Sequence, residues 1–144
     1  LAVGGHDMKI HVFRFEKDGY EDHVKVAECS GHQSIVKNID WSSNSLYLRS
    51  NSADLALLFW NPVTGDRVTD KDLVEDLDWA SHSCVLTFES IGIWNTSDKE
   101  KTDINAVARS GELLAAAEDD GHVHLYSYPS TQVSNASLSM VSSL

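Results

Sequence analysis

Residues 29–60 read CSGHQSIVKNIDWSSNSLYLRSNSADLALLFW, and this stretch decides the fold. Five of its residues bear most directly on the fold: His32, Ser50, Ser52, Asp54 and Trp60. The two serines lie on the same side of a strand, because side chains alternate between its faces. An imidazole, a hydroxyl, a carboxylate and an indole N–H in this order can form one buried chain of hydrogen bonds. We therefore expect a structural tetrad in which either serine supplies the hydroxyl.

The rest of the chain consists of short β-type runs separated by turn residues. Alternating apolar residues, punctuated by Gly, Asn, Asp and Pro, are typical of an all-β fold. The expected strands are Lys9–Phe15, His23–Cys29, Ile35–Trp41, Leu46–Arg49, Leu55–Trp60, Leu77–Trp79, Cys84–Phe88, Ile91–Trp94, Ile104–Ala108, Leu113–Ala117 and His122–Tyr128. No long amphipathic helix is predicted.

A repeat runs through these strands. Strands ending in an aromatic residue recur at spacings of 47, 34 and 32 residues, at Phe13, Trp60, Trp94 and Tyr126. An aspartate lies six residues before three of these aromatics, at Asp7, Asp54 and Asp120, and we expect Asp7 and Asp120 to be the repeat equivalents of Asp54 in a turn. A further triplet recurs as Ile39-Asp40-Trp41, Leu77-Asp78-Trp79 and Asp103-Ile104-Asn105.

The repeat predicts a WD-repeat β-propeller. A four-stranded unit of about 40 residues cannot bury both of its faces alone, and stacking such units around an axis buries them. Closed propellers have about 4–8 blades, so 144 residues make an incomplete propeller of about three and a half blades. We expect the partial propeller to span residues 1–130. We expect residues 131–144 to form a divergent tail that is disordered or holds one residual strand around Gln132-Val133. An unrelated β-sandwich with accidental spacing is the alternative.

Several motifs in order resemble one family, the echinoderm microtubule-associated protein-like family. They are Cys29-Ser30-Gly31-His32, Ile39-Asp40-Trp41-Ser42, Ser50–Asp54, Phe59-Trp60, Asp78-Trp79, Cys84-Val85-Leu86, Gly92-Ile93-Trp94, Thr102–Val107 and Val123–Pro129. The resemblance covers about residues 1–130 and implies the later blades of the second of two tandem propellers. The chain departs from the family pattern at Ala53, where a glycine is usual, in Asn95–Lys101 and after Pro129.

The resemblance implies a non-catalytic interaction module of a cytoplasmic, cytoskeletal protein. Members are microtubule-associated, and the propeller is similar to a platform that contacts tubulin or other partners. The basic, coiled-coil region credited with tight lattice binding in the family is not in this chain. The alternative is a generic WD-repeat adaptor for a non-tubulin protein. Because the propeller is incomplete, we also expect self-association or missing blades supplied by another segment.

The charge balance limits the partners. The chain has 11 basic and 22 acidic residues, a net charge of −11. This argues against binding nucleic acid, which needs a basic face, and against attraction to an anionic membrane. The acidic microtubule exterior should repel this piece at low salt. The first residues carry neither a signal peptide nor an initiator Met, which favours a chain begun mid-protein, and we expect Cys29 and Cys84 to be buried thiols.

Four small constellations have a chemical interpretation beside the structural one. Cys29 with His32 forms half of a metal site, but no second half has suitable spacing. His122 and His124 share one strand face, and Asp119-Asp120-Gly121 resembles part of a calcium loop. His32, Ser50 and Asp54 are the residue types of a hydrolase triad, without a nucleophile elbow. We interpret all four structurally and expect no metal, no cofactor and no catalysis.

Overall fold

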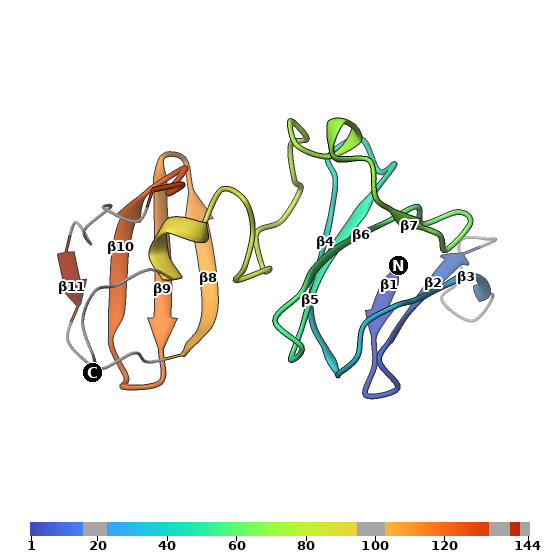
Figure 1. Cartoon of the computed structure of the whole chain (residues 1–144), viewed down its shortest axis with the longest axis horizontal. Coiled ribbons are helices and arrows are strands. Elements are labelled where there is room, and N and C mark those ends of the chain that lie inside the picture. The colour runs from blue at the N-terminus through green and yellow to red at the C-terminus, as the bar shows by residue number, and fades with distance from the viewer. Residues whose placement is uncertain (16–22, 95–102, 133–138, 142–144) are drawn as a thin grey trace. The chain divides into compact units, whose positions relative to one another are not determined.

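The computed structural model describes residues 1–15, 23–94, 103–132 and 139–141. The chain divides into two compact units, Leu1–Ser81 and His82–Leu144. The described residues of these units form eleven strands in three antiparallel sheets and two short 3₁₀ helices (Figure 1). Within the described ranges, no helix is long and apolar enough to cross a membrane. The all-β prediction is confirmed.

The N-terminal unit contains two sheets. Strands β1 (Ala2–Gly4), β2 (Lys9–Phe15) and β3 (His23–Ser30) form the first, in that order. Strands β4 (Val36–Trp41), β5 (Leu48–Ser52), β6 (Leu57–Trp60) and β7 (Arg67–Val68) form the second, followed by a 3₁₀ helix at Lys71–Leu73. Neighbouring strands within each of these sheets pair antiparallel.

The core of this unit lies between its two sheets. Each sheet has a front face, defined in the second sheet by Leu48, Ser50, Leu58 and Trp60, and a back face formed by the alternate residues. The back face of the first sheet carries Ala2, Gly4, Ile10, Val12, Ala27 and Cys29. Ile10, Val12, Ala27 and Cys29 form one buried cluster with Leu48, Leu58 and Trp60. The back face of the first sheet therefore covers the front face of the second.

The C-terminal unit contains the third sheet. Its order is β11 (Ser139–Val141), β10 (Val123–Ser127), β9 (Leu113–Glu118) and β8 (Ile104–Ser110). Its front face bears Leu114, Ala116, His124 and Tyr126, of which Leu114, Ala116 and Tyr126 are buried with Ile93 and Ile104. The expected tail, residues 131–144, thus includes the strand β11, while the strand expected around Gln132-Val133 has Gln132 outside any strand and Val133 outside the described residues. The domain boundary at residue 130 stays a prediction.

The segment between the second and third sheets differs from the expected strands. Leu77–Trp79 forms only an isolated bridge from Trp79 to Ser42, Cys84–Phe88 lies outside any strand, and Ile91–Trp94 is a 3₁₀ helix. Local contacts explain the helix: Ile93 N–H donates to Ser90 O, and the Trp94 indole donates to Val85 O at 2.9 Å. The prediction that these residues form the strands of a blade ending at Trp94 is wrong. Their apolar side chains pack against the third sheet, and the residues do not pair as strands.

The register nevertheless repeats from sheet to sheet. Trp60 pairs with Leu48, and Tyr126 pairs with Leu114. In the first sheet, Phe13 and Leu1 exchange hydrogen bonds in the same way, N–H to O at 2.8 and 3.0 Å. Both four-stranded sheets also have a register shift near the start of their first strand. Together with its β-sheets, this repeat confirms the propeller prediction.

One predicted correspondence is wrong. Ile39 pairs with Ser50, and Val107 pairs with Ala116, so Ile39-Asp40-Trp41 corresponds to Val107-Ala108-Arg109 and not to Asp103-Ile104-Asn105. The reason is loop length. Six residues separate Trp41 from Leu48, whereas four separate Arg109 from Leu114. Counting along the sequence therefore misplaces the first strand of the repeat.

Candidate functional site

The predicted tetrad residues lie together between the first two sheets. Trp60 Nε1–H donates to Ser50 Oγ at 2.8 Å, and His32 Nε2 lies 2.8 Å from the same oxygen. His32 Nδ1 lies 3.1 Å from Asp54 Oδ2. A single tautomer satisfies all of these groups: Nδ1–H donates to Asp54, Nε2 accepts from the Ser50 hydroxyl, and that oxygen accepts from the indole. Trp60 and Ser50 are fully buried.

Ser50, and not Ser52, supplies the hydroxyl of the tetrad. Both serines are buried in β5, but Ser52 Oγ accepts the backbone N–H of Asp54 at 3.3 Å. Ser52 thus shapes the turn that carries the carboxylate. The sequence left the two serines equivalent because they share one face of the strand.

Two features place the imidazole. Gly31 precedes it, and a Cβ at Gly31 would lie 3.0 Å from the Trp60 ring, so the glycine permits this close approach. Asp54 Oδ2 accepts the Gln33 N–H at 2.7 Å as well as contacting His32. The Asp54 carboxylate that orients the imidazole therefore also holds the turn before β4.

The surroundings of Asp54 favour its charged form. Partial burial disfavours the charged carboxylate, but the N–H groups of Gln33 and Ala56 and the His32 ring outweigh it and lower the pKa of Asp54 below its usual value. Its Oδ1 accepts the Ala56 N–H at 2.9 Å, two residues along the turn.

The repeat-equivalent aspartates make the same turn. Asp7 Oδ1 accepts the Lys9 N–H at 3.3 Å, and Asp120 Oδ1 accepts the His122 N–H at 2.9 Å. The other tetrad positions are not repeated: Val3 and Ala116 stand at the register position of Ser50, and Phe13 and Tyr126 stand at that of Trp60. In the described part of the chain, the complete network occurs in the second sheet.

A second buried polar cluster lies on the back face of the same sheet. Arg49 Nε donates to Asp40 Oδ2 at 3.0 Å, and both side chains are buried. Ser81 Oγ donates to Asp40 Oδ1 at 2.7 Å, and the Arg49 guanidinium lies 4.4 Å from the Trp79 ring centroid. The cluster fastens residues 79–81 to the sheet. Sequence reasoning missed it, although the cross-strand pairing of Asp40 with Arg49 was its available signal.

The other residues with a possible chemical role, which are cysteines, histidines and the tetrad serine, have structural contacts. Cys29 and Cys84 are buried and form no disulfide with each other, as predicted, and burial raises the pKa of the Cys29 thiol to about 11. The His122 and His124 rings are 6.3 Å apart, with His122 Nδ1 2.8 Å from Asp120. Within the described ranges, no group of three or more His, Cys, Asp or Glu is placed to hold a metal ion. Because Ser50 has no exposed surface, its hydroxyl is closed to a substrate.

Sheets stacked front to back around a His–Ser–Asp–Trp network define a WD-type β-propeller. Comparison with known proteins agrees: residues 1–141 match the family described as the echinoderm microtubule-associated protein second beta-propeller. The chain belongs to this family.

Its relatives are much longer proteins. The chain is 43% identical over 134 residues to human echinoderm microtubule-associated protein-like 2, covering 92% of this chain and 20% of that protein. It is 40% identical over 131 residues to the 77 kDa echinoderm microtubule-associated protein of Strongylocentrotus purpuratus, covering 90% and 19%. The crystal structure of the computationally designed Ika8 protein shares the fold, with a TM-score of 0.64 at 18% identity, over 99% of this chain and 46% of that one.

Replacing Ser50 should destabilise the chain far more than replacing Ser52. Ser50→Ala leaves a buried indole N–H and a buried imidazole nitrogen without a partner, at a cost of about 1–3 kcal/mol in free energy of unfolding. Ser52→Ala, the matched control, removes one long hydrogen bond and should cost at least about 1 kcal/mol less. Urea unfolding followed by fluorescence measures both. Equal losses would contradict the geometry.

Removing the Asp54 charge should have an effect that disappears in acid. The folded pKa of Asp54 is lowered, so its contribution to stability is present above its unfolded pKa of about 3.9 and is lost as the pH falls through the folded value. Asp54→Asn should therefore be less stable than the parent chain at pH 7, and the difference should shrink as the pH falls below about 3.9. Urea unfolding across this range measures the difference. A difference that stays constant with pH would refute this role.

Proposed function

We propose that this chain is a non-catalytic WD-repeat interaction module of a microtubule-associated protein, acting in the cytoplasm at the cytoskeleton. It would contribute to contacts with tubulin or another cytoskeletal partner and so to microtubule organisation. The family match over residues 1–141 carries this proposal. The names of the relatives describe microtubule-associated proteins, and the chain spans about a fifth of their length.

The buried networks support a scaffold rather than a reactive centre. The His32 imidazole and the Ser50 hydroxyl hydrogen-bond to each other between the sheets, and Arg49 hydrogen-bonds to Asp40 on the back face of the second sheet. What the units offer to a partner is their exposed surface: sheet faces, turns and edges. Recognition by such a surface is the usual role of a propeller and needs no cofactor.

Charge sets the expected strength of any lattice contact. A piece with net charge −11 meets an acidic microtubule exterior, so long-range electrostatics oppose the encounter at low salt. We expect tight binding to the microtubule lattice to need parts of the longer protein outside this chain. The chain itself would contribute contacts that depend on shape complementarity and buried apolar area.

Co-sedimentation tests this assignment. The isolated chain should pellet weakly or not at all with microtubules at low salt, because like charges repel. A salt series from about 0.05 to 0.3 M separates screening from specific contact. Stoichiometric pelleting that does not change with salt would contradict weak binding by this piece.

The alternative is an adaptor for a protein other than tubulin. The back face of the third sheet is uncharged along β8–β10 and includes the half-buried Ala115 and Leu125, which favours a partner chosen by apolar contact. Using the chain as bait for purified tubulin dimers and for a tubulin-depleted lysate distinguishes the two proposals. Capture of purified tubulin supports the first, and capture only from the depleted lysate supports the second.

A further inference from the structure

One exposed arginine of the C-terminal unit is held in place at the surface. Arg109 is the next-to-last residue of β8 and is exposed. Its Nε–H donates to Gly111 O at 3.0 Å, and its Nη1 donates to His82 Nε2 at 3.0 Å. The guanidinium carbon lies 4.1 Å from the centroid of the Tyr128 ring. These three contacts fix a long side chain that would otherwise sample many rotamers in water.

The turn between β8 and β9 brings these contacts together. Gly111 opens this turn with a φ of +59°, which glycine adopts freely and other residues rarely do. The next carbonyl, that of Glu112, accepts the Tyr128 N–H at 2.8 Å and so places the tyrosine beside the turn. The His82 ring meets the Tyr128 ring edge to face, with centroids 5.5 Å apart. All of these residues belong to the C-terminal unit, so the arrangement is built within one unit.

The guanidinium keeps hydrogen-bond donors for another molecule. An arginine carries five N–H groups and can only donate, so His82 Nε2 and Gly111 O each accept one of them. Two N–H groups on Nη2 and one on Nη1 are left over from these contacts. N–H groups of this planar fork suit the oxygens of a carboxylate or a phosphoryl group.

Neutral groups position the Arg109 charge without neutralising it. Three other cations of this chain, in which acidic residues outnumber basic ones 22 to 11, contact acids instead. Lys9 and Lys25 both pair with Glu28, and Arg49 pairs with Asp40. The contacts of Arg109 in the described part of the chain are a carbonyl, an imidazole and an aromatic ring. Its positive charge is therefore available to an anion from outside.

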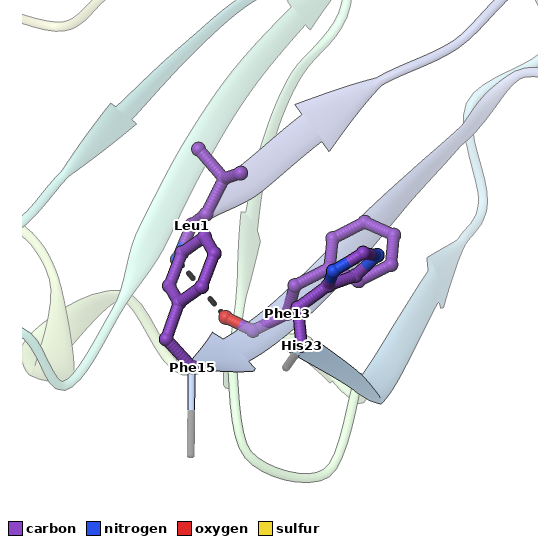
Figure 2. A pocket seen from close by; sticks show the side chains of 4 residues that line it. All are labelled: Leu1, Phe13, Phe15 and His23. Carbon is purple, nitrogen blue, oxygen red and sulfur yellow. Dashed lines mark hydrogen bonds between the residues drawn. The ribbon is translucent and has the colours of Figure 1, made fainter. Parts of the chain in front are cut away.

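The pocket at the end of β2 differs in this respect. Leu1, Phe13, Phe15 and His23 line a cavity of about 320 Å³, and Figure 2 shows them with the hydrogen bond from the Leu1 amino group to Phe13 O. The His23 ring lies 5.7 Å from the Phe13 ring and 6.3 Å from the Phe15 ring, between centroids. The rings there pack on one another, whereas the Tyr128 ring supports a cation.

We propose that Arg109 binds one oxyanion of a protein partner, a carboxylate or a phosphoryl group carried on an otherwise uncharged peptide segment. A segment with several negative charges is disfavoured, because a chain of net charge −11 repels it at long range. A single oxyanion instead gains charge-assisted hydrogen bonds at short range. Since the guanidinium is already held, binding costs little of its conformational entropy. The site adds a ligand chemistry to the proposed function and does not depend on the partner being tubulin.

Three matched peptides test the ligand chemistry. Each is an acetylated and amidated Gly-Ser-Gly-X-Gly-Ser-Gly, in which X is glutamate, phosphoserine or glutamine. They are titrated into the whole chain at about 0.05 M salt and followed by NMR. At least one charged peptide should bind at least about tenfold more tightly than the glutamine peptide. The charged peptide that binds more tightly distinguishes a carboxylate partner from a phosphoryl partner.

Three variants test the residue. Arg109→Gln removes the charge and should weaken binding of the charged peptide at least about tenfold. Arg109→Lys keeps the charge but loses the planar fork and its stacking on the ring, and should also weaken binding. Arg67→Gln, the matched control, removes the charge of an exposed arginine in β7 and should change the affinity by less than about twofold, because salt screens distant charges.

A measurement on the parent chain covers the case in which a variant fails to fold. The side-chain Nε–H signals of Arg109 and Arg49 are followed in the same titration. The Arg109 signal should move with the concentration of the charged peptide. The Arg49 signal should stay in place, because this guanidinium is buried and bonded to Asp40.

Three results would overturn the proposal. They are equal affinities for the glutamine peptide and both charged peptides, equal losses in Arg67→Gln and Arg109→Gln, and an affinity of Arg109→Lys equal to that of the parent. An Arg109 signal that stays in place while a charged peptide binds elsewhere would also contradict it. Microtubule pelleting does not enter these ratios, so failure of the proposed function would be seen separately.

Discussion

The indole N–H of Trp60 has to find an acceptor in a place that water does not reach. The ring lies between two sheets with no exposed surface, and an unsatisfied donor there would cost about 1–3 kcal/mol. Ser50 supplies the acceptor, His32 holds the Ser50 hydroxyl in place, and Asp54 holds His32. Packing and hydrogen bonding therefore depend on each other. The apolar back face of the first sheet can pack over Trp60 only when the hydrogen bonds from Trp60 to Ser50, His32 and Asp54 are all made.

The third sheet keeps the register of the second but fills it differently. Ala116 stands in place of Ser50 and Tyr126 in place of Trp60, and Ile93 and Trp94 pack on the sheet from a 3₁₀ helix rather than from a neighbouring strand. Ala116 has no hydroxyl to accept a hydrogen bond, so the network of the second sheet is not repeated here, whereas the Asp120 turn is. The feature that repeats between the described sheets is therefore the backbone register, whereas the complete hydrogen-bond network occurs in the second sheet.

The sequence allowed most strands and the tetrad positions to be predicted, because alternation and the Asp-to-aromatic spacing are local signals. It did not distinguish Ser50 from Ser52, since side-chain period places both on one face. It misassigned Ile91–Trp94, whose apolar residues have a strand pattern but bury against the third sheet as a 3₁₀ helix. Arg49 was missed because its partner Asp40 lies across the sheet, and only the register brings the two together.

A double-mutant cycle on Ser50 and Trp60 tests the central claim most directly. Ser50→Ala, Trp60→Phe and the double variant are compared with the parent chain by urea unfolding, with Trp41→Phe as the control for losing an indole at the edge of the same core. The hydrogen bond between Trp60 and Ser50 predicts a coupling energy of about 1 kcal/mol or more for Ser50 with Trp60, and none with Trp41. Losses for Ser50→Ala and Trp60→Phe that add within about 0.3–0.5 kcal/mol would contradict it.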